Sequence, residues 1–325
     1  MTRSVLDLDP RTYRRHPLHL TERIWTETNC YVDVWIEILH ALGLDPVAAG
    51  AFALDSDFDG SQWTFFKYPP EDLRAVYGME VAELNVWRPV IDHVEEHLAR
   101  GRLLTVEADS WFLPDTHGVS YRIDHQKSTI VPQWLDRDGR QLDYFHNAGY
   151  FHLEGDDFDG VFRRGAHADT GNLDPYVEVI NLDRLRVEPE GCLTELAVAG
   201  LRDHLARRPD TNPMPRFRAG LDEYLPTLAG AGADEFHLYA FGTCRQSGAA
   251  AEFAATFVDW LGERDGGGLD PVSAALRRIA EQVKALEFLL ARLLWGRTVD
   301  LDGPFASLAE DWEAAMSALV ARYGD

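Results

Sequence analysis

The sequence contains few cysteines and no long apolar run. Its 325 residues include three cysteines, Cys30, Cys192 and Cys244, which are far apart and form no CxxC pair. This spacing argues against a disulfide framework and a thiolate zinc site. Every apolar run is shorter than the roughly 20 residues needed to span a bilayer, and the first residues lack the apolar core of a signal peptide. We therefore expect a cytoplasmic protein with reduced thiols and no membrane partner.

Positive charge is scarce as well. Lysine and arginine total 31 against 54 aspartate and glutamate residues, which gives a formal net charge of −23. A surface this acidic repels phosphate backbones, so we expect no nucleic-acid partner. The histidines lack the HxH and HExxH spacings of metal sites, and the glycine-rich stretch at 265–268 lacks the lysine of a phosphate-binding loop. Neither a metal nor a nucleotide cofactor is indicated.

The residues that are present divide the chain into two parts. Apolar residues make up 46% of the sequence, enough for a substantial core. Up to Phe162 helical and strand signals are mixed, whereas beyond Leu193 the pattern is almost wholly helical. The stretch between them is rich in glycine, aspartate and small residues, as is typical of a linker. We predict a domain at 1–165, a linker at 166–192 and a helical domain at 193–325, with helices over 193–207, 249–261, 272–294 and 305–323.

Cys30 stands at the start of a predicted helix. An apolar run extends from Val32 to Leu42, and Gly43 follows as a stop signal. Asp33, Glu37 and His40 recur at the spacing of one helix face. A cysteine at a helix N-terminus meets unpaired N–H groups and the positive end of the macrodipole, which lower a thiol pKa. Cys30 is therefore a candidate nucleophile, and the alternative is a small buried apolar side chain.

Antiparallel strands are expected after the helix. The segment 103–108 alternates as a strand does, and a second strand begins at Ser128. Pro132 interrupts this second strand, which predicts an edge or a bulge there because proline donates no hydrogen bond. A turn over 136–140 with an Asp-Gly pair leads into a returning strand at 141–145, and another turn and strand follow. The pattern indicates a β-hairpin.

The predicted hairpin brings a candidate base, His125, close to the residues that follow the returning strand. His125 precedes the second strand, and His146 and Asn147 follow the third, so antiparallel pairing places them at the same end of the sheet. A histidine held by a carboxamide can take a proton from a cysteine. We predict a catalytic group of Cys30, His125 and Asn147. The alternative is that His125 is a solvated loop residue and Asn147 only a turn former.

Two further residues are candidates for binding or positioning. Asp109 ends the first strand and could position a neighbour or stabilise charge. Arg245 could bind a substrate carboxylate or phosphate, since a guanidinium holds either group in bidentate fashion. Equally, Arg245 could cap a helix or pair with Glu252.

Four segments carry a family resemblance. They are 28–33 (TNCYVD), 63–67 (WTFFK), 83–89 (ELNVWRP) and 144–150 (YFHNAGY). These segments resemble a bacterial family described as domain of unknown function 1839. The order of Cys, His and Asn also resembles the papain-like fold, particularly that of bacteriocin-leader cysteine peptidases. The two-part layout is similar to that of the butirosin-type aminoacyl transferase. The resemblance implies an α+β chain, with a papain-like domain containing an antiparallel sheet followed by an all-α helical domain.

The resemblance also implies a function. It indicates a cysteine-dependent acyltransferase that moves an aminoacyl or acyl group from a carrier-protein thioester to an amine acceptor. The implied partners are an aminoacyl carrier protein, an amino-acid:carrier-protein ligase and a small-molecule amine. No cofactor is implied beyond the phosphopantetheine arm that delivers the substrate. The alternatives are a cysteine hydrolase or peptidase, and a catalytically silent module that binds a carrier or a metabolite.

The sequence departs from the papain-like pattern at one position. Papain-like peptidases have a glutamine six residues before the nucleophile as an oxyanion donor, and Ile24 occupies that place here. Asn29, Thr28 or the backbone N–H of Cys30 are the candidate replacements. The third catalytic residue is either His146 or Asn147, because these two residues are adjacent.

Overall fold

The computed structural model describes residues 2–20, 22–26, 29–168 and 174–324. These residues divide into two compact units, each assembled from separate segments of the chain. The first unit contains the described residues of 1–21, 29–46 and 70–187, and the second contains those of 22–28, 47–69 and 188–325. Cys30, His125 and Asn147 all belong to the first unit.

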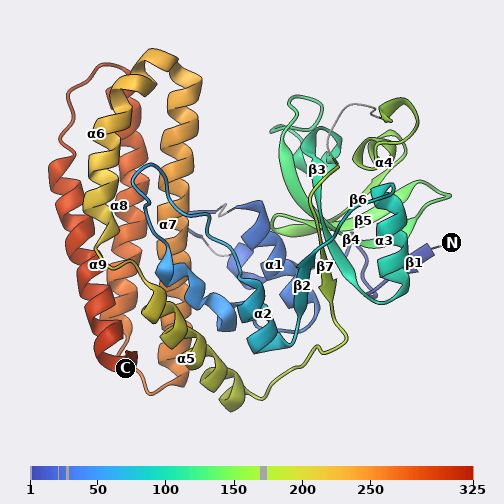
Figure 1. Cartoon of the computed structure of the whole chain (residues 1–325), viewed down its shortest axis with the longest axis horizontal. Coiled ribbons are helices and arrows are strands. Elements are labelled where there is room, and N and C mark those ends of the chain that lie inside the picture. The colour runs from blue at the N-terminus through green and yellow to red at the C-terminus, as the bar shows by residue number, and fades with distance from the viewer. Residues whose placement is uncertain (1, 21, 27–28, 169–173, 325) are drawn as a thin grey trace. The chain divides into compact units, whose positions relative to one another are not determined.

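An antiparallel sheet forms the centre of the first unit (Figure 1). Its strand order is β2-β7-β3-β4-β5-β6, and β1 pairs with the far end of β4. Among the described residues the strands are β1 (Thr2–Ser4), β2 (Glu80–Glu83), β3 (Leu103–Asp109), β4 (Lys127–Asp136), β5 (Gln141–His146), β6 (Gly149–Glu154) and β7 (Val177–Asn181). The core strands are rich in β-branched and aromatic residues, which pack well on a pleated surface.

The predicted hairpin is confirmed. Strands β4 and β5 pair in antiparallel register, and the register shifts between Pro132 and Trp134. This shift is the bulge that the missing N–H of proline predicts. By contrast, the predicted linker at 166–192 contains β7, which pairs with both β2 and β3. The linker assignment is therefore too long, because a short strand after a glycine-rich stretch has little sequence signal.

Helix α1 is the buried helix of the first unit and contacts β4, β5 and β6. Its apolar side chains are fully buried from Val32 to Leu39. Gly43 follows with φ +72°, the left-handed conformation that favours glycine after a helix. The longer helices of this unit are α1 (Cys30–Ala41), α2 (Pro70–Tyr77), α3 (Val90–Ala99) and α4 (Asp156–Val161).

The second unit is helical. Helices α6, α7, α8 and α9 lie side by side (Figure 1). The helices are α5 (Glu190–Arg207), α6 (Pro213–Ala231), α7 (Ala233–Arg264), α8 (Asp270–Leu294) and α9 (Asp302–Tyr323). The structure thus has a mixed helix and sheet unit and a helical C-terminal region, as expected. In the part of the chain described, no helix is both long and apolar enough to cross a membrane.

A short segment at 22–26 packs against these helices. The two carboxylate oxygens of Glu252 on α7 accept hydrogen bonds from the backbone N–H groups of Ile24 and Trp25, at 2.8 and 2.9 Å. The indole N–H of Trp25 donates to the carbonyl of Ala280 on α8 at 3.1 Å. Residues from the beginning of the chain therefore form part of the helical unit.

Candidate functional site

Cys30 is the first residue of helix α1. Asn29 caps this helix, since its Oδ1 accepts from the N–H of Val32 at 2.9 Å. The carboxamide oxygen of Asn29 is thus engaged by the helix. The Cys30 side chain is half-buried, and its sulfur lies 3.9 Å from Oγ1 of Thr129 on β4. The N–H of Cys30 has no acceptor among the described residues, as is usual in a first helical turn.

His125 is oriented by a carboxylate. Its Nδ1 lies 2.6 Å from Oδ2 of Asp109, and this carboxylate makes Nδ1 the donor. The imidazole stacks on Trp111, with ring centroids 4.4 Å apart and planes 8° from parallel. The backbone N–H of Ser110 donates a hydrogen bond to the carbonyl of Gln126 at 2.8 Å, which closes the loop that carries both rings. The histidine side chain is 64% exposed. Its Nε2 is therefore the nitrogen left for proton transfer.

The sheet register relates this pair to the cysteine. Thr129 pairs with Glu107, and Lys127 pairs with Asp109. Residues two apart on a strand point to the same face, so Thr129 and Asp109 share one face of the sheet. Because the Cys30 sulfur contacts the Thr129 side chain, the cysteine and the Asp109–His125 pair lie on that same face.

The predicted catalytic residues Cys30, His125 and Asn147 are not joined to one another by hydrogen bonds among the residues described. Within the part of the chain described, no hydrogen bond joins Cys30 to His125. Asn147 has φ +45° and occupies the two-residue turn between His146 and Gly149, a conformation that asparagine adopts readily. Its Nδ2 is 3.5 Å from Nδ1 of His146. The structure therefore brings Asp109, not Asn147, to the imidazole of His125.

His146 belongs to a buried network on the opposite face of the sheet. Its Nδ1 donates to Oδ2 of Asp115 at 2.5 Å, and its Nε2 accepts from the hydroxyl of Ser128 at 2.6 Å. Tyr144 donates to the other oxygen of Asp115. Ser128 and Thr129 are consecutive on β4, so their side chains point to opposite faces. The network is a Ser-His-Asp chain, which the sequence interpretation missed.

Burial decides the role of this network. The imidazole of His146 is 0% exposed, and Ser128 is 8% exposed. A nucleophile must meet its substrate, whereas a buried polar group needs partners to offset the loss of water. The chain of hydrogen bonds satisfies every buried nitrogen of the ring. We interpret it as the polar core that holds β4, β5 and the loop after β3 together.

Helix α1 also carries a buried charge cluster. Glu37 accepts from the hydroxyl of Tyr13 at 2.6 Å and from the backbone N–H of His16 at 3.0 Å. The imidazole of His19 bridges Glu37 and Asp33, its Nε2 lying 3.3 Å from Asp33 Oδ1. All three ionisable side chains of this bridge are at least 96% buried. Two residues of the polar stripe predicted on this helix, Asp33 and Glu37, thus belong to an internal ion network. The third, His40, lies apart from it, with its Nε2 3.1 Å from the carbonyl oxygen of Arg14.

The remaining candidates lie elsewhere. Arg245 is an exposed residue of α7 in the second unit, and Glu252 binds the backbone of residues 24 and 25 instead of Arg245. None of the three cysteines forms a disulfide bond among the residues described: Cys192 is exposed, and Cys244 is fully buried. Burial raises the pKa of the Cys244 thiol well above its usual range. No group of three or more potential metal ligands occurs among the residues described.

Comparison with known families also divides the chain into two parts. The model of the DUF1839 N-terminal domain matches residues 14–182, and that of the DUF1839 C-terminal domain matches residues 190–321. The division between the two matches follows β7 and lies close to the boundary between the units at residues 187 and 188, although residues 47–69 fall within the first match and belong to the second unit. No curated protein matches the chain. Because the two family models together span most of its length, the chain belongs to the DUF1839 family and contains both of its domains.

Proposed function

We propose that the first unit is a papain-like domain and that the protein is a cysteine-dependent acyltransferase. One observation carries the proposal. Cys30 stands at the capped N-terminus of α1, on the same sheet face as a histidine that a carboxylate holds at Nδ1. A cysteine, a base and a group that orients the base are the parts that nucleophilic acyl transfer requires.

The first step forms an acyl-enzyme. His125 takes the thiol proton of Cys30 through Nε2, and the sulfur attacks the carbonyl carbon of a donor thioester. The carbon–sulfur bond of the donor breaks, and the leaving thiolate takes the proton back from His125. Asp109 is a positioning residue, because its carboxylate accepts from Nδ1 and so fixes the tautomer and the orientation of the imidazole. The free N–H of Cys30 donates to the developing oxyanion.

The second step releases the acyl group. A small-molecule amine attacks the acyl carbon, its proton passes to His125, and the bond to the Cys30 sulfur breaks. A carrier protein presents the donor on a phosphopantetheine arm, and an amino-acid:carrier-protein ligase charges that carrier. If water replaces the amine, the same site acts as a hydrolase.

The experiment follows thiol release from aminoacyl-pantetheine thioesters by the full chain. Cys30→Ala should lower the rate at least about a thousandfold, because no other group forms the covalent intermediate. His125→Ala should lower kcat about 100- to 10,000-fold, the range that a general base supplies. Asp109→Asn should lower kcat less and shift the pH profile, since it acts through the ring.

Two exposed residues provide matched controls. Cys192→Ala removes the exposed thiol of the second unit, and His117→Ala removes an exposed imidazole from the loop that carries His125. Both variants should keep the wild-type rate. Equal rates for wild type and Cys30→Ala would contradict covalent catalysis and favour a silent binding module. Release of the acyl group as a free acid, with no amide formed at saturating amine, would assign hydrolysis instead of transfer.

A further inference from the structure

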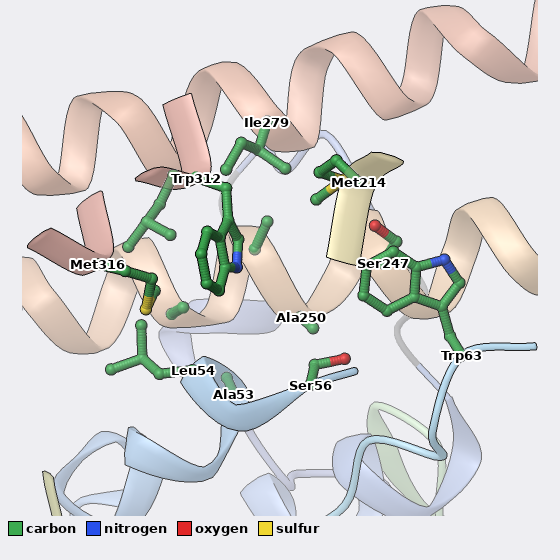
Figure 2. Close-up of a pocket in the computed structure, with 13 residues that line it drawn as sticks. Ala53, Leu54, Ser56, Trp63, Met214, Ser247, Ala250, Ile279, Trp312 and Met316 are labelled. Atoms are coloured by element: carbon green, nitrogen blue, oxygen red, sulfur yellow. The ribbon is translucent and has the colours of Figure 1, made fainter. Parts of the chain in front are cut away.

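The interior of the helical unit has little room for a ligand at its largest aromatic cluster. Figure 2 shows a hollow lined by the indoles of Trp63 and Trp312 and by the thioethers of Met214 and Met316. Its free space is about 30 Å³, which holds a water molecule or two. Water therefore suffices for the buried polar groups of its wall, and larger molecules are excluded from it.

The surface of the same unit carries a group of exposed apolar side chains. Helices α7 and α8 lie side by side (Figure 1). Leu238 and Phe241 on α7, Phe288 on α8 and Trp295 directly after α8 are between 48% and 78% exposed. The turn at 265–269 joins the two helices, and Leu238 and Trp295 are nearly equally far from it, so these residues lie level with each other. The four side chains therefore gather at one end of the helix pair, and a group of this size marks an interaction site.

The indole of Trp25 identifies the side of the helix pair on which these residues lie. A Cβ at Gly248 of α7 would be 2.2 Å from this indole, and Nζ of Lys284 on α8 lies 4.2 Å from a ring centre. Phe241 comes seven residues before Gly248, and Phe288 comes four residues after Lys284. Both spacings return to the same face of a helix. The face that Trp25 covers therefore continues along both helices to Phe241 and Phe288, where it is exposed.

Charged residues flank the apolar pair on α7. Asp234 comes four residues before Leu238, and Arg245 comes four residues after Phe241, so all four share one helix face. Neither Asp234 nor Arg245 has an ion-pair partner among the residues described. If a second copy of α7 lies antiparallel on the first, Asp234 faces Arg245 of the second copy, and Leu238 faces its Phe241. The face is therefore complementary to itself.

Helix α8 fits the same arrangement. The twofold axis of such a pair passes midway between Leu238 and Phe241, and this point is level with 292–295 at the end of α8. The axis sets Arg292 against Trp295 of the second copy, and a guanidinium is attracted to the face of an indole. Arg292 likewise has no ion-pair partner in the described part of the chain. Both helices thus present self-complementary side chains around one axis.

We propose that this face of α7 and α8 joins two copies of the chain in a symmetric dimer. In such an interface, residue i of one copy contacts residue j of the other and the reverse, as Asp234 and Arg245 do here. The apolar side chains of the two copies bury on the order of 1,000 Å² in total, the lower end of specific interfaces. The net charge of −23 on each copy opposes association. We therefore expect a dissociation constant in the micromolar range.

Charge reversal at the interface tests the proposal. Sedimentation velocity of the full chain at micromolar concentrations should show a reversible dimer. Asp234→Arg places two arginines opposite each other and Arg245→Asp places two aspartates opposite each other, so each change should weaken dimerisation at least about tenfold. The double variant Asp234→Arg/Arg245→Asp should dimerise like the wild type, because its charges are exchanged and remain opposite. An equimolar mixture of the two single variants should form a heterodimer for the same reason.

Glu310→Arg on α9 and Arg202→Asp on α5 are the matched controls. Both residues are exposed in the same unit, and the changes shift the net charge as the two test variants do. Both controls should dimerise like the wild type. The proposal is overturned if the wild type stays monomeric at these concentrations, which would leave the exposed face to a different partner. It is also overturned if the dimer tolerates both reversals or if the mixed single variants stay apart. Because sedimentation measures association, none of these outcomes depends on the chemistry of Cys30.

Discussion

Glu37→Ala should destabilise the first unit by about 3–5 kcal/mol. Glu37 is fully buried and accepts hydrogen bonds from Tyr13, His16 and His19. Removing one partner of a buried ion network leaves the other charge uncompensated, which is far more costly than losing a surface pair. Urea unfolding, followed by near-ultraviolet circular dichroism, measures the loss. Glu83→Ala, an exposed change on β2, should alter the free energy of unfolding by no more than about 0.5 kcal/mol.

The same cluster should make stability depend on pH. Burial alone would lower the pKa of His19, but its hydrogen bonds to Asp33 and Glu37 outweigh burial and raise the pKa above the ordinary value of 6.5. For Glu37, burial would raise the pKa, and the hydrogen bonds from His19 and Tyr13 lower it below 4.5. The histidine contribution is therefore complete below pH 6.5 and is lost as the pH rises through the raised pKa. The Glu37 contribution is complete above pH 4.5 and is lost as the pH falls.

This sign can be checked with a variant that does not titrate. Between about pH 4.5 and 6.5 both contributions are present, so the cluster should stabilise most there. The wild type should lose stability as the pH rises above 6.5. His19→Gln should be less stable at pH 6 and should lack that loss. A variant with the same slope as the wild type between pH 6 and 9 would show that His19 is not the group responsible.

Gly248→Ala should destabilise the helical unit by about 1–3 kcal/mol, although alanine usually favours a helix. A Cβ at this position would lie 2.2 Å from the indole of Trp25, a rigid ring held by a hydrogen bond to Ala280. Overpacking of this kind forces a ring or a helix to move. Gly242→Ala lies on the same helix, and apart from the helix's own backbone no described residue has an atom within 4 Å of the new Cβ, so this change should stabilise the unit by up to about 1 kcal/mol.

Thermal unfolding of the two glycine variants decides the point. Opposite signs are expected, because both changes give the same gain in helix propensity and only Gly248 faces the indole. If both variants raise the melting temperature, residues 22–26 do not hold Trp25 against α7. A lower melting temperature for Gly242→Ala alone would likewise contradict the packing described.

Local signals predicted the parts of the fold that depend on neighbouring residues. The cap at Asn29 and the stop at Gly43 define α1, and Pro132 marks the bulge in β4. The sequence pattern did not predict the full extent of two helices in the second unit. Helix α6 has prolines at 213 and 215 in its first turn, where no N–H bond is lost, and a third inside it at 226. Helix α7 begins at Ala233, whereas the sequence pattern predicted a start at residue 249. The prediction missed the first part of the helix because Leu238 and Phe241 are apolar but exposed, which obscures the amphipathic pattern.

The candidate site was predicted in part for a similar reason. Strand alternation separates Ser128 from Thr129, but only the packing of α1 decides which face holds the cysteine. Asp109 and His125 meet because the loop between them closes, and a separation of 16 residues gives no sequence signal for that contact. Asn147 satisfies a turn geometry that a catalytic asparagine would also fit. The sequence therefore predicted which kinds of residue the site contains, whereas only the tertiary structure shows which residues contact one another.

The acyl-enzyme itself tests the central claim most directly. Wild-type protein is incubated with a panel of glycyl-, alanyl- and β-alanyl-pantetheine thioesters without an amine, quenched in acid, and analysed by peptide mass spectrometry. The acyltransferase account predicts an added acyl mass on the peptide that contains Cys30, and none on any peptide of Cys30→Ala. Consumption of the thioesters without an acyl group on Cys30, or with the group on Ser128, would contradict it.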